Sequence, residues 1–248
     1  MTVPPCLGAN AGNCPTKGRS MATAQLVQTT VTYSGQRFTR YPIRTHWLSE
    51  NEDLAAVLLS YTSDRQSGDT IAISEKVAIL LADKTVPVET ICVRWLGRLL
   101  ARFIRPQLGE ALGLSVPPKM QYVINETGRA RILAAAAASA LTRPLGIRGV
   151  FYRVAGTLAR DIDGGVEPHE HHLFPPLDPT EAAQLCEGFE QSVGVGIAIV
   201  DMNDFGGSIR ATSTSSLPAA ALTEILADNP MGQKVTTTPF VIIRPEPS

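Results

Sequence analysis

The chain has 248 residues, of which 44% are hydrophobic and 18% charged, and its formal net charge is -1. This much apolar sequence can bury a substantial core, as one large domain or as two interlocked lobes. The balanced charge argues against nucleic acid or an anionic membrane as the main partner, since both normally require a strongly basic surface. A small-molecule function is therefore expected.

The compartment is indicated by the N-terminal composition and the cysteine spacing. Residues 1–28 are rich in Pro, Gly, Asn and Thr and lack the apolar run of a secretory signal, so they are predicted to be a flexible extension before a domain at 29–248. No uncharged segment is long enough to cross a bilayer of ~30 Å. The cysteines show no C-x-x-C spacing, which argues against a disulfide framework or a zinc knuckle. They are Cys6, Cys14, Cys92 and Cys186. A cytoplasmic protein is expected.

The first half of the domain is predicted to alternate between extended segments and helices. Residues 29–41 are extended, and 49–61 form a helix with Ser49 as N-cap and Glu52 at the capping-box position. Residues 70–79 are predicted to form a strand that contains Lys76. Residues 88–105 are predicted to form an amphipathic helix. Its expected buried stripe is Val88, Ile91, Trp95, Leu99 and Phe103, and its solvated face carries Arg94, Arg98 and Arg102.

The second half mixes helices and strands without regular alternation. The pattern predicts helices at 128–142, after Asp178-Pro179, and at 218–228, each with a capping or stop signal. It predicts strands at 149–154, 195–200 and 240–244, with a Ser/Thr-rich loop after the second of these. This order favours an α+β fold with mixed or antiparallel sheets and packed helices.

The strongest chemical signal is an apolar strand that runs into Asp201, Asn203 and Asp204 and then a glycine-rich turn. Carboxylates at the end of a strand that is buried on both faces are energetically costly unless a cationic or polar group lies beside them. Asp161 and Asp163 would point the same way in an extended segment. If these two sets converge, they would suit Mg²⁺ or Mn²⁺. The alternative for Asp161 and Asp163 is a simple turn.

Three basic residues and one amide are further candidates. Lys76 is either a strand-edge lysine that discourages aggregation or a point charge for a phosphate. Arg148 lies directly before the predicted strand 149–154 and Arg153 near its end, and both are candidates for phosphate or carboxylate contacts. Gln233 follows a helix stop and turn, and it could present its amide to a metal or a base.

The run His169-Glu170-His171-His172 suggests a transition metal, because imidazoles bind such ions well. Its spacing does not match H-E-x-x-H on a helix and prolines flank it, so an exposed loop is the favoured interpretation. The chain has no Walker A loop, no G-x-S-x-G elbow and no G-x-G-x-x-G after a strand. Any nucleotide must therefore bind at an unconventional site.

Several of these segments, in their order, resemble the coenzyme F-420 gamma-glutamyl ligase family, and within it a longer branch. The similarity extends from about Arg40 to Arg244. It is carried by residues 68–76, 146–156, 161–164, 199–206, 229–233 and 238–244. The family's strand-end pattern Asp-Thr-Phe-Gly can be aligned in two ways here, on Asp201 or on Asp204.

The resemblance implies an α+β fold with interlocked lobes, forming an intertwined homodimer. It implies a GTP- or ATP-dependent amide ligase assisted by Mn²⁺ or Mg²⁺, with K⁺ also helpful. In such an enzyme a substrate carboxylate becomes an acyl phosphate, which the amine of L-glutamate attacks. By resemblance the metal ligands are Asp161 or Asp163, Asp201 or Asp204, and Gln233. The nucleotide contacts are Lys76, Asn203, Gly206 and Gln233. A binding protein without turnover and a metal-dependent phosphohydrolase are the alternatives.

Overall fold

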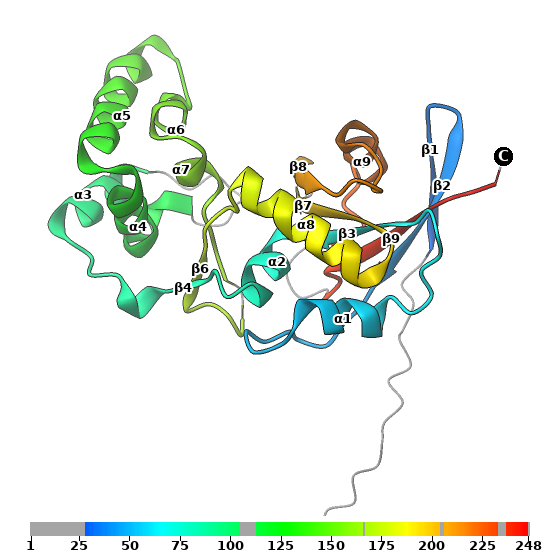
Figure 1. Cartoon of the computed structure of the whole chain (residues 1–248). Helices are drawn as coiled ribbons and strands as arrows, with labels where there is room; N and C mark the ends of the chain where they lie inside the picture. The colour runs from blue at the N-terminus through cyan, green and yellow to red at the C-terminus, as the bar shows by residue number, and fades with distance from the viewer. Residues whose placement is uncertain (1–27, 105–112, 166, 204–205, 233–236, 248) are drawn as a thin grey trace, which may run out of the picture.

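The computed structural model describes residues 28–104, 113–165, 167–203, 206–232 and 237–247. The predicted N-terminal extension lies outside the described residues except for Gln28. The described chain is mixed α+β, as the sequence predicts, with a sheet covered by helices and a separate group of helices beside it (Figure 1). No described helix combines the length and the apolar composition that crossing a membrane would require.

A six-stranded sheet forms the larger part of the described chain. Its strands, in spatial order, are β1 (Thr29–Tyr33), β2 (Gln36–Ile43), β9 (Phe240–Pro245), β3 (Thr70–Ser74), β7 (Gly196–Asn203) and β8 (Gly206–Thr212). Strands β3 and β7 are parallel, and every other pair in this sheet is antiparallel. The sheet is therefore mixed, and its parallel pair requires a long connection that leaves the sheet and returns.

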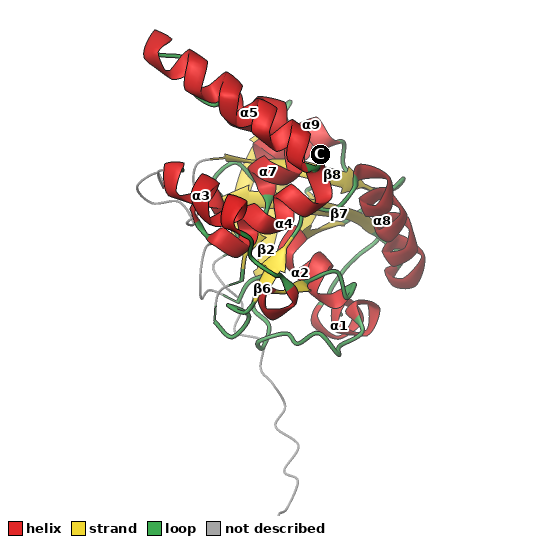
Figure 2. Ribbon diagram, turned by 90° about the vertical axis from the view of Figure 1, so that its left-hand side faces the viewer, coloured by secondary structure: helices red, strands yellow, loops and turns green. Residues whose placement is uncertain are grey.

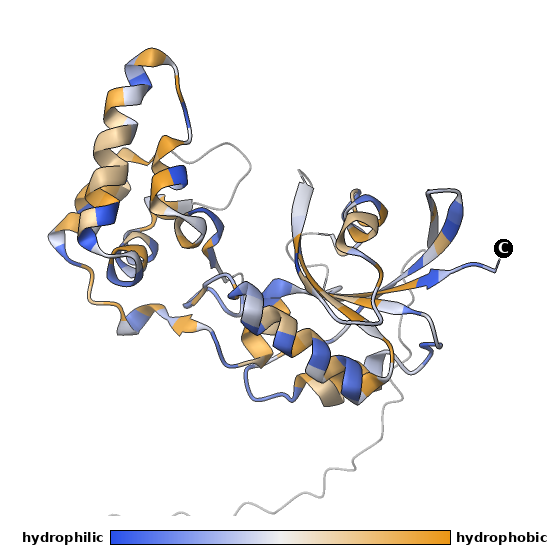
Figure 3. Ribbon diagram, turned by 45° about the horizontal axis from the view of Figure 1, so that its top comes forward, coloured by the Kyte–Doolittle hydropathy of each residue, from blue (hydrophilic) through white to orange (hydrophobic). Residues whose placement is uncertain are grey.

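Alternation along the central strands gives the sheet two buried faces. One face contributes Ile71, Ile73, Ile197, Ile199 and Ile242 to a core with α1 (Leu54–Tyr61), α2 (Glu75–Leu81) and α8 (Pro179–Val193). The opposite face contributes Ala72, Ala198, Val200, Val241 and Ile243 to a core with α9 (Ala219–Ile225). Successive residues of a strand point to opposite sides, so one apolar run serves both cores. Figure 3 shows the hydrophobic residues along these strands.

The remaining helices pack around a core of their own. They are α3 (Trp95–Phe103), α4 (Pro117–Thr127), α5 (Arg129–Thr142), α6 (Val150–Ala155) and α7 (Thr157–Asp161). Short 3-10 helices η1 (Val88–Thr90), η2 (Gly113–Ser115) and η3 (Arg143–Leu145) accompany them. Met120, Val123, Ile132 and Phe151 are central to this core. Figures 1 and 2 show that this helical part lies at one end of the larger sheet.

A small three-stranded sheet joins the two parts. Its order is β4 (Val86–Pro87), β6 (His172–Phe174) and β5 (Asp163–Gly164). In β6, Leu173 packs into the helical core and Phe174 into the core of the larger sheet. Because neighbouring strand residues face opposite ways, this one strand contributes a side chain to each core.

The structure corrects the prediction that 70–79 is one strand. Strand β3 ends at Ser74, and α2 starts at Glu75, so Lys76 lies in the first turn of a helix. The parallel pairing of β3 with β7 is the physical reason, since the chain must leave the sheet after β3. The loop predicted after Asp201 is also corrected, because β7 continues to Asn203 and β8 pairs with it.

The prediction of a strand at 149–154 is wrong, because residues 150–155 form α6. Phe151 and Ala155 lie one helical turn apart and both pack into the helical core, which outweighs the β preference of the two valines. The helix predicted from Ser49 starts only at Leu54, with Asp53 accepting a hydrogen bond from the backbone of Ala55.

The predicted buried stripe of residues 88–105 is corrected in the same way. Only 95–103 is α-helical, and Trp95 and Phe103 are 71% and 63% exposed. The buried face of α3 carries Gly97 and Ala101. A Cβ at Gly97 would lie 2.7 Å from Gln121 Oε1, so the small residues are what let α3 approach α4. The arginines of this segment are exposed, as predicted. Cys92 is exposed in a loop, and Cys186 is buried in α8.

A buried ion pair ties the start of β3 to the end of β9. Asp69 is 1% exposed and receives bonds from Arg244 Nε and Nη2 at 2.9 and 2.7 Å. Replacing Arg244 with Ala leaves a buried carboxylate without its cation, so we expect the free energy of unfolding to fall by about 3 kcal/mol in urea denaturation. The control Arg37→Ala breaks an exposed pair with Glu246 and should cost less than about 1 kcal/mol. Equal losses would contradict this account.

Candidate functional site

A polar pocket lies where the larger sheet, the small sheet and the helical part meet. Its lining comprises Glu75, Lys76, Ile79, Asp161, Asp163, Phe174, Pro176 and Asp201. The cavity volume is about 20 Å³, which is room for one water molecule or one ion. The lining is dominated by charged side chains, and its apolar residues are Ile79, Phe174 and Pro176.

The parallel strands explain why residues far apart in sequence meet here. Ser74 at the end of β3 is paired with Val200 of β7, so Glu75 and Asp201 follow at the same edge of the sheet. Ligands of α/β sheets bind beyond the carboxyl ends of parallel strands. Asp163 reaches the same place through β5, where it pairs with Phe174 of β6.

Arg210 of β8 holds three of the carboxylates. Its Nε lies 2.8 Å from Glu75 Oε2, its Nη1 2.9 Å from Asp161 Oδ2, and its Nη2 3.3 Å from Asp201 Oδ2. A planar guanidinium with five donors suits this arrangement. The sequence predicts a cationic or polar partner for Asp201 at the end of the buried strand. In the structure, Arg210 is a cationic partner of Asp201.

Asp163 has a separate set of partners. Lys76 forms an ion pair with its Oδ2, Lys119 Nζ lies 3.8 Å from its Oδ1, and the backbone N–H of Gly164 donates to Oδ1 at 2.8 Å. Lys119 is 5% exposed. A Cβ at Gly164 would lie 3.0 Å from Lys119 Cε and 3.1 Å from its Nζ, so glycine leaves the space for this buried ammonium group.

The two aspartates before Gly164 are held in their charged form. Burial acts to raise the pKa of Asp161, but the hydrogen bonds from Arg160 and Arg210 outweigh it, and the net shift is downward. Burial also acts to raise the pKa of Asp163, but the Lys76 ammonium and the Gly164 amide outweigh it, and the net shift is again downward. Both carboxylates therefore stay ionised near neutral pH.

The other side of the pocket shows the opposite effect. Burial raises the pKa of Glu75 despite its bond with Arg210. Burial, with the nearby Asp163 and Asp161, raises the pKa of Asp201. Burial lowers the pKa of Lys119. Ionisable groups whose pKa values are pushed apart in one cleft are typical of functional sites.

The structure brings four of the predicted site residues together. Asp161, Asp163, Asp201 and Lys76 all line the pocket. Arg148 and Arg153 do not, since both are exposed near α6 and Arg153 donates to the backbone oxygen of Arg148. Asn203 and Gly206 pair with each other at the end of the β7–β8 hairpin and are not part of the lining. Asp204 and Gln233 lie outside the described residues.

Three charged residues of the site were not singled out from the sequence: Glu75, Lys119 and Arg210. Glu75 stands next to Lys76 but was assigned to a strand. Arg210 could have been found only by recognising the β7–β8 hairpin, which brings it beside Asp201. Lys119 follows two prolines at the start of α4, and nothing in that pattern indicates a site.

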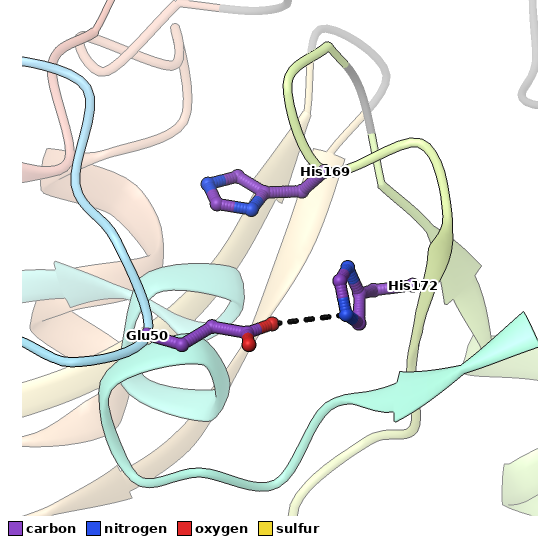
Figure 4. A group of neighbouring side chains, drawn as sticks. All are labelled: Glu50, His169 and His172. Atoms are coloured by element: carbon purple, nitrogen blue, oxygen red, sulfur yellow. Dashed lines mark ion pairs between the residues drawn. The ribbon is translucent and has the colours of Figure 1, made fainter.

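A second group of side chains has the composition of a metal centre. Glu50, His169 and His172 each offer a ligand atom, and these atoms all lie within 4.8 Å of one another (Figure 4). His169 and His172 are only partly exposed, so the sequence interpretation of this stretch as an exposed loop holds for His171 but not for these two.

Neither a scan against protein-family models nor a search of curated proteins finds a match for this chain. Its function must therefore be argued from the residues of the site.

The role of Arg210 can be tested through pH. Arg210→Met leaves three carboxylates without their shared cation, so we expect a loss of at least about 3 kcal/mol at pH 7.5 in urea denaturation. Without the cation the folded-state pKa values of all three acids rise: those of Glu75 and Asp201 move further above their unfolded values, and that of Asp161 loses part of its downward shift. The folded variant then binds more protons than the unfolded chain as pH falls, so the deficit relative to the parent protein should shrink towards pH 5.

The matched control is Arg160→Ala, because Arg160 also pairs with Asp161 but its side chain is 65% exposed. It should cost less than about 1 kcal/mol at every pH. A deficit in Arg210→Met that is constant from pH 8 to pH 5 would show that these carboxylates do not depend on the guanidinium.

Proposed function

We propose that this protein is a nucleotide- and divalent-metal-dependent amide ligase, which joins an amino acid to a carboxylate substrate through an acyl phosphate. The amino acid that the family resemblance favours is L-glutamate, and the nucleotide is GTP or ATP. The observation that carries the proposal is the pocket itself, where Lys76 and Asp163 form an ion pair at the carboxyl ends of two parallel strands and the buried Lys119 lies 3.8 Å from the other oxygen of Asp163.

The lining suits phosphoryl transfer better than nucleophilic catalysis. Phosphoryl transfer needs cations that position and neutralise phosphate oxygens, and needs little covalent chemistry from the protein. Lys76 of the lining and the buried Lys119 next to Asp163 provide such cations, and the described lining contains no Ser, Cys or His that could serve as a nucleophile. This composition favours an enzyme that holds a polyphosphate.

The carboxylates fit a metal that arrives with the nucleotide. Among the described residues, no three carboxylates of this pocket bring ligand oxygens within 4.8 Å of one another, so they do not form a complete cage. Mg²⁺ usually binds through one or two carboxylates plus substrate phosphates. Asp163 and Asp201 are the proposed ligands, because Asp161 is already held by two arginines. A bound Mg²⁺ or Mn²⁺ would neutralise phosphate oxygens. Asp204, Gln233 and a K⁺ ion remain parts of the proposal.

The chemistry that we propose has two transfers. First, a carboxylate oxygen of the acid substrate takes the γ-phosphoryl group, and the nucleoside diphosphate leaves. Then the amine nitrogen of the amino acid attacks the acyl carbon, the carbon–oxygen bond to phosphate breaks, and inorganic phosphate leaves as the nitrogen loses a proton. Lys76 and Lys119 would hold the phosphate oxygens through both transfers. The cytoplasm, where nucleoside triphosphates are made, is the proposed compartment.

The size of the pocket implies that binding needs movement. A cavity of about 20 Å³ cannot hold a triphosphate. The pocket lies between the larger sheet and the helical part, and the Lys76–Asp163 ion pair forms part of its lining. Phosphate oxygens would take the place of Asp163 at Lys76, and Asp163 would then be free to bind the metal.

The test is an assay of the purified chain with GTP or ATP, Mn²⁺ or Mg²⁺, glutamate, and the deazaflavin precursor or other carboxylic acids. Mass spectrometry detects the amide, and phosphate release is followed in parallel. Lys76→Ala and Asp163→Asn should each lower amide formation at least about 100-fold, since they remove a charge from the transferred phosphate or from its metal. Lys84→Ala is the control, because Lys84 pairs with Glu181 away from the pocket.

Other outcomes would contradict the proposal in distinct ways. Phosphate release without an amide would indicate a phosphohydrolase. Nucleotide binding without turnover would indicate a binding protein. Unchanged activity in both pocket variants would remove this pocket from the reaction.

We also propose that the protein is a homodimer, with the intertwined arrangement of interlocked lobes that the resemblance implies. The helical part exposes large apolar side chains that a second copy would cover. They are Trp95, Leu99, Phe103, Leu133, Leu141, Leu145 and Ile147. Figure 3 shows the hydrophobic colour at the far end of α5 and the turn that follows it. Exposed apolar surface of this kind is typical of association sites.

If the helical part forms the interface, Trp95→Glu combined with Phe103→Glu should convert a dimer into a monomer, because each buries a charge at the contact. Light scattering coupled to gel filtration measures the mass. Leu59→Glu is the control. Leu59 is also exposed, but it lies on α1, which packs against the larger sheet and not in the helical part. A monomeric parent protein at micromolar concentration would refute this proposal.

A further inference from the structure

We infer that Glu50, His169 and His172 form a binding site for a divalent transition metal of the zinc class, separate from the proposed ligase pocket. The three side chains come from the loop before α1, from a turn and from strand β6. In Figure 4 the two imidazole rings and the carboxylate point toward one another.

The separations suit a tetrahedral ion. His172 Nε2 lies 3.2 Å from Glu50 Oε1, and the rings of His169 and His172 have centroids 6.4 Å apart at an interplanar angle of 63°. Two ligand atoms that are each about 2.1 Å from a tetrahedral zinc lie about 3.4 Å from each other. All three ligand atoms are within 4.8 Å, so small side-chain rotations are enough to reach this geometry.

His169 already has the orientation and tautomer of a metal ligand. Its Nε2 lies 2.9 Å from the backbone oxygen of Leu48. A carbonyl oxygen can only accept, so Nε2 carries the hydrogen and Nδ1 of the neutral ring carries the lone pair. Metal-binding histidines commonly donate their other N–H to a backbone carbonyl in this manner.

His172 also keeps its coordinating capacity. Its Nε2 faces Glu50, and its Nδ1 is buried without a hydrogen-bond partner. A buried polar atom without a partner is unusual in a folded protein and requires an explanation. Glu50 is in turn oriented by Thr85, whose hydroxyl donates to Oε1 at 3.1 Å. The cluster therefore has a second shell of hydrogen bonds around two of its three members.

Backbone hydrogen bonds hold the two histidines on one turn. The N–H of His172 donates to the oxygen of His169 at 3.0 Å, and the N–H of Gly165 donates to the oxygen of His172 at 3.0 Å. A Cβ at Gly165 would lie 1.7 Å from the oxygen of His169, so only glycine permits this close approach. The site is built into the fold and does not depend on the chance positions of surface side chains.

The ligand set selects the metal. Two imidazoles and one carboxylate favour Zn²⁺, Co²⁺ or Ni²⁺ over Mg²⁺ or Ca²⁺, which prefer oxygen ligands. Three protein ligands leave one position for water, as in other His₂Glu zinc sites. The ion would fasten the loop before α1 to β6, two residues from Phe174, which lines the ligase pocket. It would thereby stabilise the strand that joins the two cores.

The test uses the full chain after removal of metal with a chelator. Titration calorimetry with Zn²⁺ should show one equivalent bound at least about 100-fold more tightly than Mg²⁺. Co²⁺ should give the visible absorption of a tetrahedral complex. His169→Ala and His172→Ala should each weaken Zn²⁺ binding about 100-fold, and Glu50→Gln at least about 10-fold. The control is His171→Ala, because His171 is 85% exposed and outside the cluster.

Circular dichroism of each metal-free variant checks that it folds, and none of these measurements depends on ligase activity. Zn²⁺ binding that is no tighter than Mg²⁺ binding would overturn the inference. So would a His171→Ala variant that loses as much affinity as His169→Ala, since the metal would then bind the histidine-rich stretch without the geometry described.

Discussion

The architecture around the pocket depends on one guanidinium group. Arg210 contacts carboxylates from the start of α2, the end of α7 and the end of β7, so it ties the helical part to the larger sheet. Three acids so close together would repel one another without a shared cation. The opposed pKa shifts follow from this, because Asp161 gains two arginine partners, whereas burial dominates at Glu75 and Asp201.

Strand β6 gives the two candidate sites a common support. His172 belongs to the proposed metal centre, Leu173 to the helical core, and Phe174 to the lining of the pocket. The two sites differ in chemistry, since oxygen ligands beside lysines suit a nucleotide-bound Mg²⁺ or Mn²⁺ and imidazoles suit zinc. Strand β6 thus contributes residues both to the proposed ligase pocket and to the metal site that is proposed to stabilise the fold.

The sequence predicted those features that depend on local patterns. The apolar run of β7, the helix start at Asp178-Pro179 and the mixed α+β class follow from periodicity and capping. The carboxylate at 201 could be singled out because a polar group at the end of a buried strand needs a partner. Asp161 and Asp163 were singled out by their spacing in an assumed extended segment, whereas Asp161 ends helix α7. The errors at α2, α3 and α6 occurred where packing or strand topology outweighed local preference, as with Gly97 and Ala101, whose smallness made them the buried face.

By itself, the sequence determined which segments are apolar enough to form a core and which acidic residues need a cationic partner. Only the tertiary structure decided that the partner is Arg210, that Lys119 joins Lys76 at Asp163, and that Glu50 meets two histidines more than a hundred residues away. The reason is that hydropathy and capping act over a few residues. Contacts between distant segments, in contrast, depend on how strands pair and on how closely the helices pack.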